Sequence, residues 1–98
     1  MDNITPILSQ IATLGATFGA QKIVLFGSRA RGDHHQRSDI DLAVYGLPTA
    51  NKGQFAFQLE ELPTLLKFDV VLVDDHTDAA LVAQIKTDGV TIYETDET

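Results

Sequence analysis

The chain has 98 residues, no cysteine and a formal net charge of −7. This length predicts a single domain, residues 1–98, with a modest core. The lack of cysteine excludes disulfide bonds and zinc–thiolate sites, and the acidic balance argues against a large nucleic-acid footprint, which requires clustered Lys and Arg. No stretch is apolar over the length of a membrane span, and the N-terminus lacks a signal-peptide pattern. We therefore expect a cytoplasmic protein that binds neither membranes nor nucleic acids directly.

A helix and a strand are expected at the start of the chain. Thr5-Pro6 is typical of a helix start, and Gly19 is expected to end the helix. The apolar residues that recur between them at helical spacing are Ile7, Leu8, Ile11, Leu14 and Phe18. The apolar run 23–26 then predicts a short buried strand, which Gly27-Ser28 stops abruptly. Residues 29–31 could add one helical turn.

Carboxylates alternate with aliphatic residues along the segment 38–44. In a strand, Asp39 and Asp41 would point to the same face, with their Cα atoms about 6.6 Å apart. The aliphatic residues that would face the core on the other side are Ile40, Leu42 and Val44. Two carboxylates at this spacing repel each other unless a cation lies between them, and such oxygen ligands suit Mg²⁺ together with substrate phosphates. The nearby glycine–serine turn offers backbone N–H groups that suit a phosphate.

The second half of the chain predicts two helices and two strands. The helices are expected at about 52–62 and 79–88, and the strands at 67–73 and 90–93. Asp69 is an acidic residue in the apolar strand 67–73, and a lone buried carboxylate is costly. If this strand neighbours the strand with the other two carboxylates, Asp69 can complete a site of three. The alternative is an edge position where Asp69 meets water.

The order of the expected elements is helix, strand, strand, helix, strand, helix and strand. This order favours an α/β or α+β fold. We expect a small mixed β-sheet with the helices packed on one face, which leaves the other face open.

The spacing of the two motifs resembles a known family. Gly27-Ser28, a spacer of ten residues and Asp39-Ile40-Asp41 resemble the signature of nucleotidyltransferases related to DNA polymerase beta. The short length looks like the minimal nucleotidyltransferase (MNT) branch of that superfamily. The resemblance implies the nucleotidyltransferase fold, with the site on the open side of the sheet. It also implies a Mg²⁺-dependent enzyme that transfers AMP from ATP to a hydroxyl group.

The resemblance implies roles for the residues of the motifs. Asp39, Asp41 and Asp69 would be catalytic and would hold two Mg²⁺ ions. Asp69 could also take the proton of the acceptor hydroxyl as a general base. Gly27 and Ser28 would hold the triphosphate of ATP.

The polar residues around the motifs leave alternatives open. Arg29 and Ser38 are further candidates for the nucleotide site. For Arg29 and Arg31, one side chain would contact the triphosphate, or both are solvated surface cations. Ser38 would bind the nucleotide or hydrogen-bond the loop. His34 and His35 lie in the polar loop, where solvation is the expected state, and their roles and that of Arg31 stay open.

The resemblance also suggests a partner. Minimal nucleotidyltransferases of this kind are commonly paired with a helical HEPN-domain protein, an RNase toxin, and act as antitoxins that AMPylate one of its tyrosines. The acidic balance would suit a basic, RNA-cleaving partner. The alternative is a non-catalytic antitoxin or regulatory subunit that neutralises its partner by contact, and a homodimer or a hetero-oligomer is compatible with either. Transfer to a small molecule such as an aminoglycoside is a third possibility, disfavoured because the chain is too short for a substrate domain.

Overall fold

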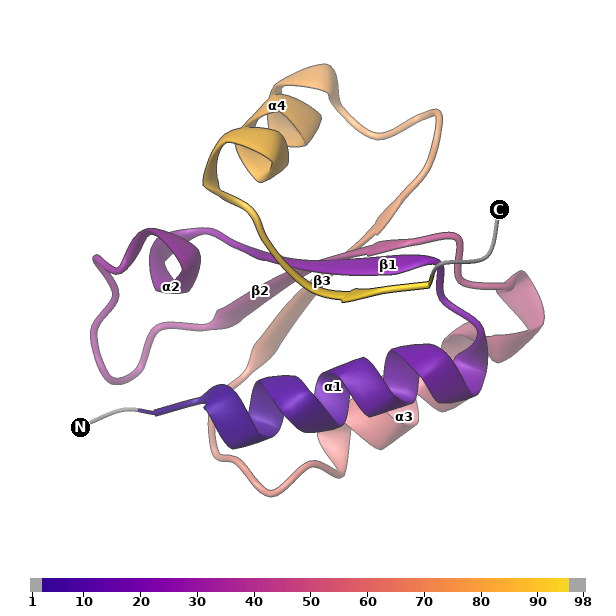
Figure 1. Cartoon of the computed structure of the whole chain (residues 1–98), viewed down its shortest axis with the longest axis horizontal. Helices are drawn as coiled ribbons and strands as arrows, with labels where there is room; N and C mark the ends of the chain where they lie inside the picture. The colour runs from indigo at the N-terminus through magenta and orange to yellow at the C-terminus, as the bar shows by residue number, and fades with distance from the viewer. Residues whose placement is uncertain (1–2, 96–98) are drawn as a thin grey trace.

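A mixed four-stranded sheet forms the centre of the structure, a computed structural model that describes residues 3–95 (Figure 1). The ends of the predicted domain, residues 1–2 and 96–98, lie outside the described residues. The strands are β1 (Lys22–Phe26), β2 (Ile40–Tyr45), β3 (Phe68–Val73) and β4 (Val90–Glu94), in the spatial order β3-β2-β1-β4. β1 is antiparallel to β2 and to β4, whereas β2 and β3 are parallel. The predicted mixed sheet is therefore confirmed.

Helices connect the strands at the positions that the sequence pattern indicates. They are α1 (Thr5–Phe18), the short α2 (Ser28–Arg31), α3 (Lys52–Glu60), which a 3₁₀ turn at Thr49–Asn51 precedes, and α4 (Ala79–Asp88). α1 begins at Thr5, one residue before the predicted first helical residue Pro6, and Gly19 caps its end, as expected from its stop signal. None of the helices within residues 3–95 combines the length and the apolar character needed to cross a lipid bilayer.

The larger core lies between the sheet and the pair of helices α1 and α3 (Figure 1). Ile11 of α1 and Phe55 of α3 are almost completely buried. Phe18 and Phe55 meet edge to face, with ring centroids 6.4 Å apart. The sheet contributes the predicted aliphatic face of β2, which is formed by Ile40, Leu42 and Val44. The alternation of aliphatic and acidic residues therefore orients β2 as the sequence predicts.

The second core lies on the opposite face of the sheet, where α4 packs. Ile85 of α4 covers Val24 and Phe26 of β1 and Ala43 of β2. The expectation that all helices pack on one face is therefore wrong, and the reason lies in β1. Residues 23–26 of β1 are all buried and apolar, so both faces of this strand need a cover.

The face under α4 also carries the carboxylates. Asp41 is two residues before Ala43 on β2, so both point to the α4 side of the sheet. Asp69 of β3 is the parallel neighbour of Asp41, and Phe26 of β1 is its antiparallel neighbour. The face is thus apolar where α4 covers it and acidic at the end where β1 gives way to α2.

Candidate functional site

Two acidic side chains lie on adjacent strands, and a third directly precedes one of these strands. Asp41 and Asp69 are in register on β2 and β3, which confirms that the two strands are neighbours. Asp39 lies one residue before β2 begins, so it precedes the strand in which it was expected. Asp41 is half-buried, whereas Asp39 and Asp69 are exposed. The site thus combines one partly desolvated carboxylate with two exposed ones.

The neighbouring carboxylates change the pKa of Asp41. Burial raises the pKa of the Asp41 carboxyl, and the charges of Asp69 and Asp39 raise the pKa further. A hydrogen bond with Asp69 acts in the same direction, whereas the charge of Arg31 lowers the pKa. A cation near the three carboxylates would therefore be favoured, because it would offset their mutual repulsion.

The chemistry of these donors fits Mg²⁺. Mg²⁺ prefers oxygen ligands and is usually bound through one or two carboxylates, with waters and phosphates at the other positions. Within residues 3–95, no three acidic or histidine side chains converge tightly enough to form a complete metal cluster. The Asp41–Asp69 pair, with Asp39 contributing charge nearby, therefore suits a cation that arrives with a phosphate better than one enclosed by protein ligands alone.

Gly27 places the turn after β1 directly against Asp41. A Cβ atom at position 27 would overlap Oδ2 of Asp41. Gly27 also has φ +77° and ψ −158°, a conformation that is essentially restricted to glycine. The predicted juxtaposition of the Gly27-Ser28 turn and the carboxylates is therefore present in the structure. Ser28 begins α2, and the first N–H groups of a helix have no partner within the helix, which makes them possible phosphate donors.

Arg29 hydrogen-bonds the loop between α2 and β2. Its side chain is buried, and its Nε donates to the carbonyl oxygen of Ser38 at 2.9 Å while its Nη2 donates to that of Gln36 at 3.2 Å. The side chain is therefore not a solvated surface cation, and a contact of Arg29 with the triphosphate stays a prediction. A buried guanidinium needs such hydrogen bonds, since burial removes its water.

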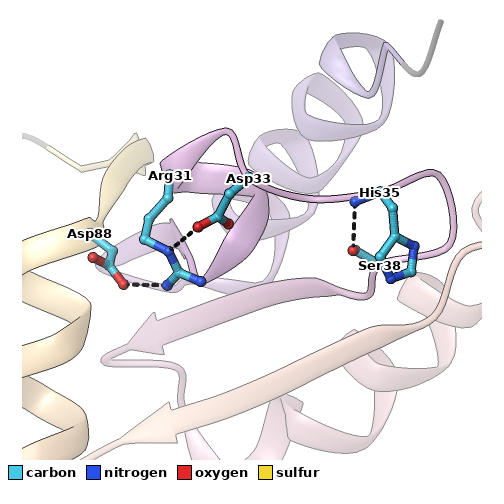
Figure 2. A network of polar contacts seen from close by, with 5 residues as sticks. All are labelled: Arg31, Asp33, His35, Ser38 and Asp88. Carbon is cyan, nitrogen blue, oxygen red and sulfur yellow. Dashed lines mark hydrogen bonds and ion pairs between the residues drawn. The ribbon is translucent and has the colours of Figure 1, made fainter.

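Ser38 closes a turn in the same loop. The backbone N–H of His35 donates to Ser38 Oγ at 3.0 Å (Figure 2). The Ser38 N–H donates to the His35 carbonyl at 3.1 Å. His35 Nδ1 in turn accepts from the Arg37 N–H at 3.3 Å. This is the loop role that the sequence left open for Ser38, and a contact with a nucleotide stays a prediction.

Arg31 is the cation that faces the site. Its Nε lies 3.0 Å from Oδ2 of Asp33, and its Nη1 lies 2.9 Å from Oδ2 of Asp88 at the end of α4 (Figure 2). The hydrogen bonds to Asp33 and Asp88 raise the pKa of the Arg31 guanidinium. Arg31 thus stays charged close to Asp41, whose pKa it lowers.

Asp88 was not among the residues singled out in the sequence. It follows Arg31 by 57 positions, so no local motif connects the two. A weak signal was present, because an acidic residue in the last turn of a helix opposes the helix dipole and indicates a contact elsewhere.

A cavity of about 510 Å³ adjoins Asp39, between the α2–β2 loop and residues 65–67. Its volume is within the range of small-molecule pockets.

Comparisons with known proteins agree with this geometry. Residues 10–98 match the family model described as polymerase beta, nucleotidyltransferase. The chain is 35% identical over 78 residues to the protein adenylyltransferase MntA of Shewanella oneidensis, a match that covers 79% of this chain and 56% of the relative. The chain therefore spans little more than half the length of that relative.

Solved structures resemble the fold over most of its length. A toxin–antitoxin crystal structure with AMP-PNP superposes with a TM-score of 0.65 and 28% identity, covering 91% of this chain and 74% of that chain. A protein classed as a minimal nucleotidyltransferase has a TM-score of 0.72 and 26% identity, covering 92% of this chain and 95% of that chain.

Proposed function

Because the chain belongs to the polymerase beta nucleotidyltransferase family, we propose that it transfers AMP from ATP to a hydroxyl group in a Mg²⁺-dependent reaction. One observation carries this proposal. Asp41 and Asp69 face each other on adjacent strands, and the Gly27 turn lies against Asp41. The turn and the carboxylates are the two parts that this chemistry requires, one for the phosphates and one for the cation.

Asp39, Asp41 and Asp69 would hold the Mg²⁺ ions, two in number if the family pattern applies. When bound, Mg²⁺ neutralises phosphate charge and stabilises the attacking and leaving oxygens. The backbone N–H groups of Ser28 and of the turn before it would orient the triphosphate. Arg31, whose charge lowers the pKa of Asp41, replaces Arg29 as the candidate cation for the phosphates.

The transfer itself is a substitution at the α-phosphorus of ATP. The acceptor hydroxyl oxygen forms a bond to this phosphorus, and the bond from the phosphorus to the bridging oxygen of the β-phosphate breaks. Pyrophosphate leaves, and the hydroxyl proton passes to Asp69, which is exposed and in register with Asp41. Positioning and charge neutralisation supply most of the rate enhancement.

The proposed acceptor is a tyrosine of a HEPN RNase toxin, so that the chain acts as an antitoxin. Support comes from the 35% identity to a protein adenylyltransferase and from the similar toxin–antitoxin structure that holds an ATP analogue. The net charge of −7 is compatible with a basic partner.

Mass spectrometry of a HEPN protein encoded beside this chain tests the proposal. After incubation with ATP and Mg²⁺, wild-type protein is expected to leave a +AMP adduct on a tyrosine. Asp41→Asn should reduce adduct formation by about 100-fold or more, because it removes a carboxylate from the cation site. Asp75→Asn, in the exposed turn after β3, is the matched control and should leave the adduct unchanged. An adduct of equal yield with Asp41→Asn would refute the assignment of the site.

The same variants separate catalysis from neutralisation by contact. Cells that express the toxin should grow with wild type and with Asp75→Asn, but not with Asp41→Asn. If Asp41→Asn forms no adduct and still restores growth, the protein acts on its partner as a non-catalytic binding subunit.

A further inference from the structure

Arg29 is an unusual residue of the fold because it is a buried cation. It is 7% exposed, and among residues 3–95 it is the one charged side chain classed as buried. It lies in α2, directly after the turn that contacts Asp41. Since a buried charge is costly unless hydrogen bonds compensate for it, its position calls for an explanation.

The hydrogen bonds of Arg29 hold the chain immediately before Asp39. Nε donates to the Ser38 carbonyl, and this carbonyl belongs to the peptide unit whose nitrogen is that of Asp39. Nη2 donates to the carbonyl of Gln36, two residues earlier. A guanidinium is planar and can donate hydrogen bonds to two carbonyl groups at once. The ammonium group of lysine, on a flexible side chain, is less suited to this geometry.

The chain immediately after Asp39 is held as well. The N–H of Ile40 donates to the Lys67 carbonyl at 2.9 Å, where β2 begins to pair with β3. Asp39 therefore sits between two anchors, Arg29 on one side and the β3 strand on the other. Asp39 is itself exposed and makes no regular strand pairing, so the two anchors set where its backbone lies.

We propose that Arg29 is a positioning residue, which fixes the backbone of Asp39 so that its carboxylate faces Asp41 and Asp69. The inference rests on the proposed function, because it gives Arg29 a role through the cation site. It differs from phosphate binding, since Nε and Nη2 of Arg29 donate to backbone carbonyls of the loop between α2 and β2.

Arg29→Lys tests this role, with Arg37→Lys as a matched control. Both variants replace a guanidinium by an ammonium and keep the charge, but Arg37 is exposed. In metal-free protein, hydrogen exchange of the segment 36–40 should be faster in Arg29→Lys and unchanged in Arg37→Lys. Mn²⁺ affinity, measured by water proton relaxation, should fall about 10–100-fold in Arg29→Lys and stay within about twofold in Arg37→Lys. A folded Arg29→Lys protein with wild-type Mn²⁺ affinity would overturn the proposal.

A measurement on the wild type covers the case in which Arg29→Lys does not fold. In nuclear magnetic resonance spectra, diamagnetic Mg²⁺ should shift the Asp39 amide and the Arg29 Nε–H signals together with the Asp41 amide signal. Shifts confined to Asp41 and Asp69 would overturn the proposal. These readouts do not require AMP transfer, so they are independent of the proposed reaction. A wild type that binds Mn²⁺ as expected but forms no adduct would refute the reaction and leave the role of Arg29 in place.

Discussion

At the scale of single residues, Asp41 combines partial burial with two neighbouring negative charges. Its raised pKa means that the folded protein binds a proton at this site more readily than the unfolded chain does. The protonated Asp41 carboxyl therefore favours the folded state, and this contribution to the free energy of unfolding is fully present below the ordinary pKa of about 3.8. It is lost as the pH rises through the higher pKa of the folded state. Once it is ionised, the Asp41 carboxylate destabilises the fold of the metal-free protein.

Asp41→Asn should therefore raise the melting temperature of metal-free protein at pH 7. Like charges paired across strands destabilise by about 0.2–1 kcal/mol, which corresponds to a few degrees in a domain of this size. The gain should shrink as the pH falls through the raised pKa of the Asp41 carboxyl, because the wild-type carboxyl then becomes protonated. Thermal melts followed by circular dichroism over a series of pH values, with Asp75→Asn as control, measure the effect. Equal melting temperatures for wild type and Asp41→Asn at pH 7 would contradict it.

Gly27 is the residue whose replacement should displace Asp41 most directly. Gly27→Ala combines backbone strain of about 1–3 kcal/mol with an overlap between the new Cβ and the Asp41 carboxylate. Gly32→Ala is the matched control, because Gly32 has φ +86° but no described atom lies within 4 Å of a Cβ built there. We expect Gly32→Ala to lose stability and keep its Mn²⁺ affinity, whereas Gly27→Ala loses both. Denaturant unfolding and Mn²⁺ titration of the two variants provide the comparison, and equal Mn²⁺ affinities would be evidence against the close packing of Gly27 on Asp41.

The residues of the site differ in how far the sequence could place them. Asp41 and Asp69 could be placed because alternation fixes the face of a strand, and an acid within an apolar strand must lie at an opening. The direction of Arg29 could not be predicted, because it depends on how the loop between α2 and β2 folds back over α2. Two carbonyl groups of that loop are among its partners, and backbone acceptors cannot be recognised in the sequence.

At the scale of elements, the sequence predicted every strand and helix to within a few residues but assigned α4 to the wrong face. The periodicity of a helix shows which of its sides is apolar, and it does not show which side of the sheet that apolar surface will meet. The information lay in β1, whose four consecutive buried residues require cover on both faces. The place of α4 has a consequence for the site, because its last residue, Asp88, contacts Arg31.

The Arg31–Asp88 contact couples α2 to the end of α4. A double-mutant cycle with Arg31→Met and Asp88→Asn should show favourable coupling in thermal stability, since Asp88 is only 13% exposed. The cycle removes the separate effect of an acidic residue on the helix dipole. The coupling should decrease when NaCl is raised to about 1 M, because salt screens exposed charges.

Asp33 supplies the control for this cycle. It also pairs with Arg31, but it is 61% exposed and lies only two residues away in the chain. Its coupling to Arg31 should be the smaller of the two. No measurable coupling to Asp88, or a coupling smaller than that to Asp33, would contradict a stabilising contact between the two elements.

At the scale of the whole molecule, the excess of negative charge makes any cation stabilising to some degree. The chain has 14 acidic and 7 basic residues, so general screening by salt should raise stability on its own. A specific Mg²⁺ site must therefore be distinguished from this background. Specific Mg²⁺ binding at the proposed site requires Asp39, Asp41 and Asp69, whereas stabilisation by general salt screening does not depend on any one of these carboxylates.

Mg²⁺ should stabilise the wild type more than NaCl of the same ionic strength does. A site filled at ten times its dissociation constant adds about 1.4 kcal/mol, which is several degrees in melting temperature for a domain of this size. In the double variant Asp41→Asn, Asp69→Asn, the specific increment should vanish and the two salts should act alike. The double variant Asp74→Asn, Asp75→Asn changes the net charge equally in an exposed turn and should keep the increment. If Mg²⁺ and ionic-strength-matched NaCl raise the wild-type melting temperature equally, the carboxylates at the start of β2 and β3 do not form a cation site in the free protein.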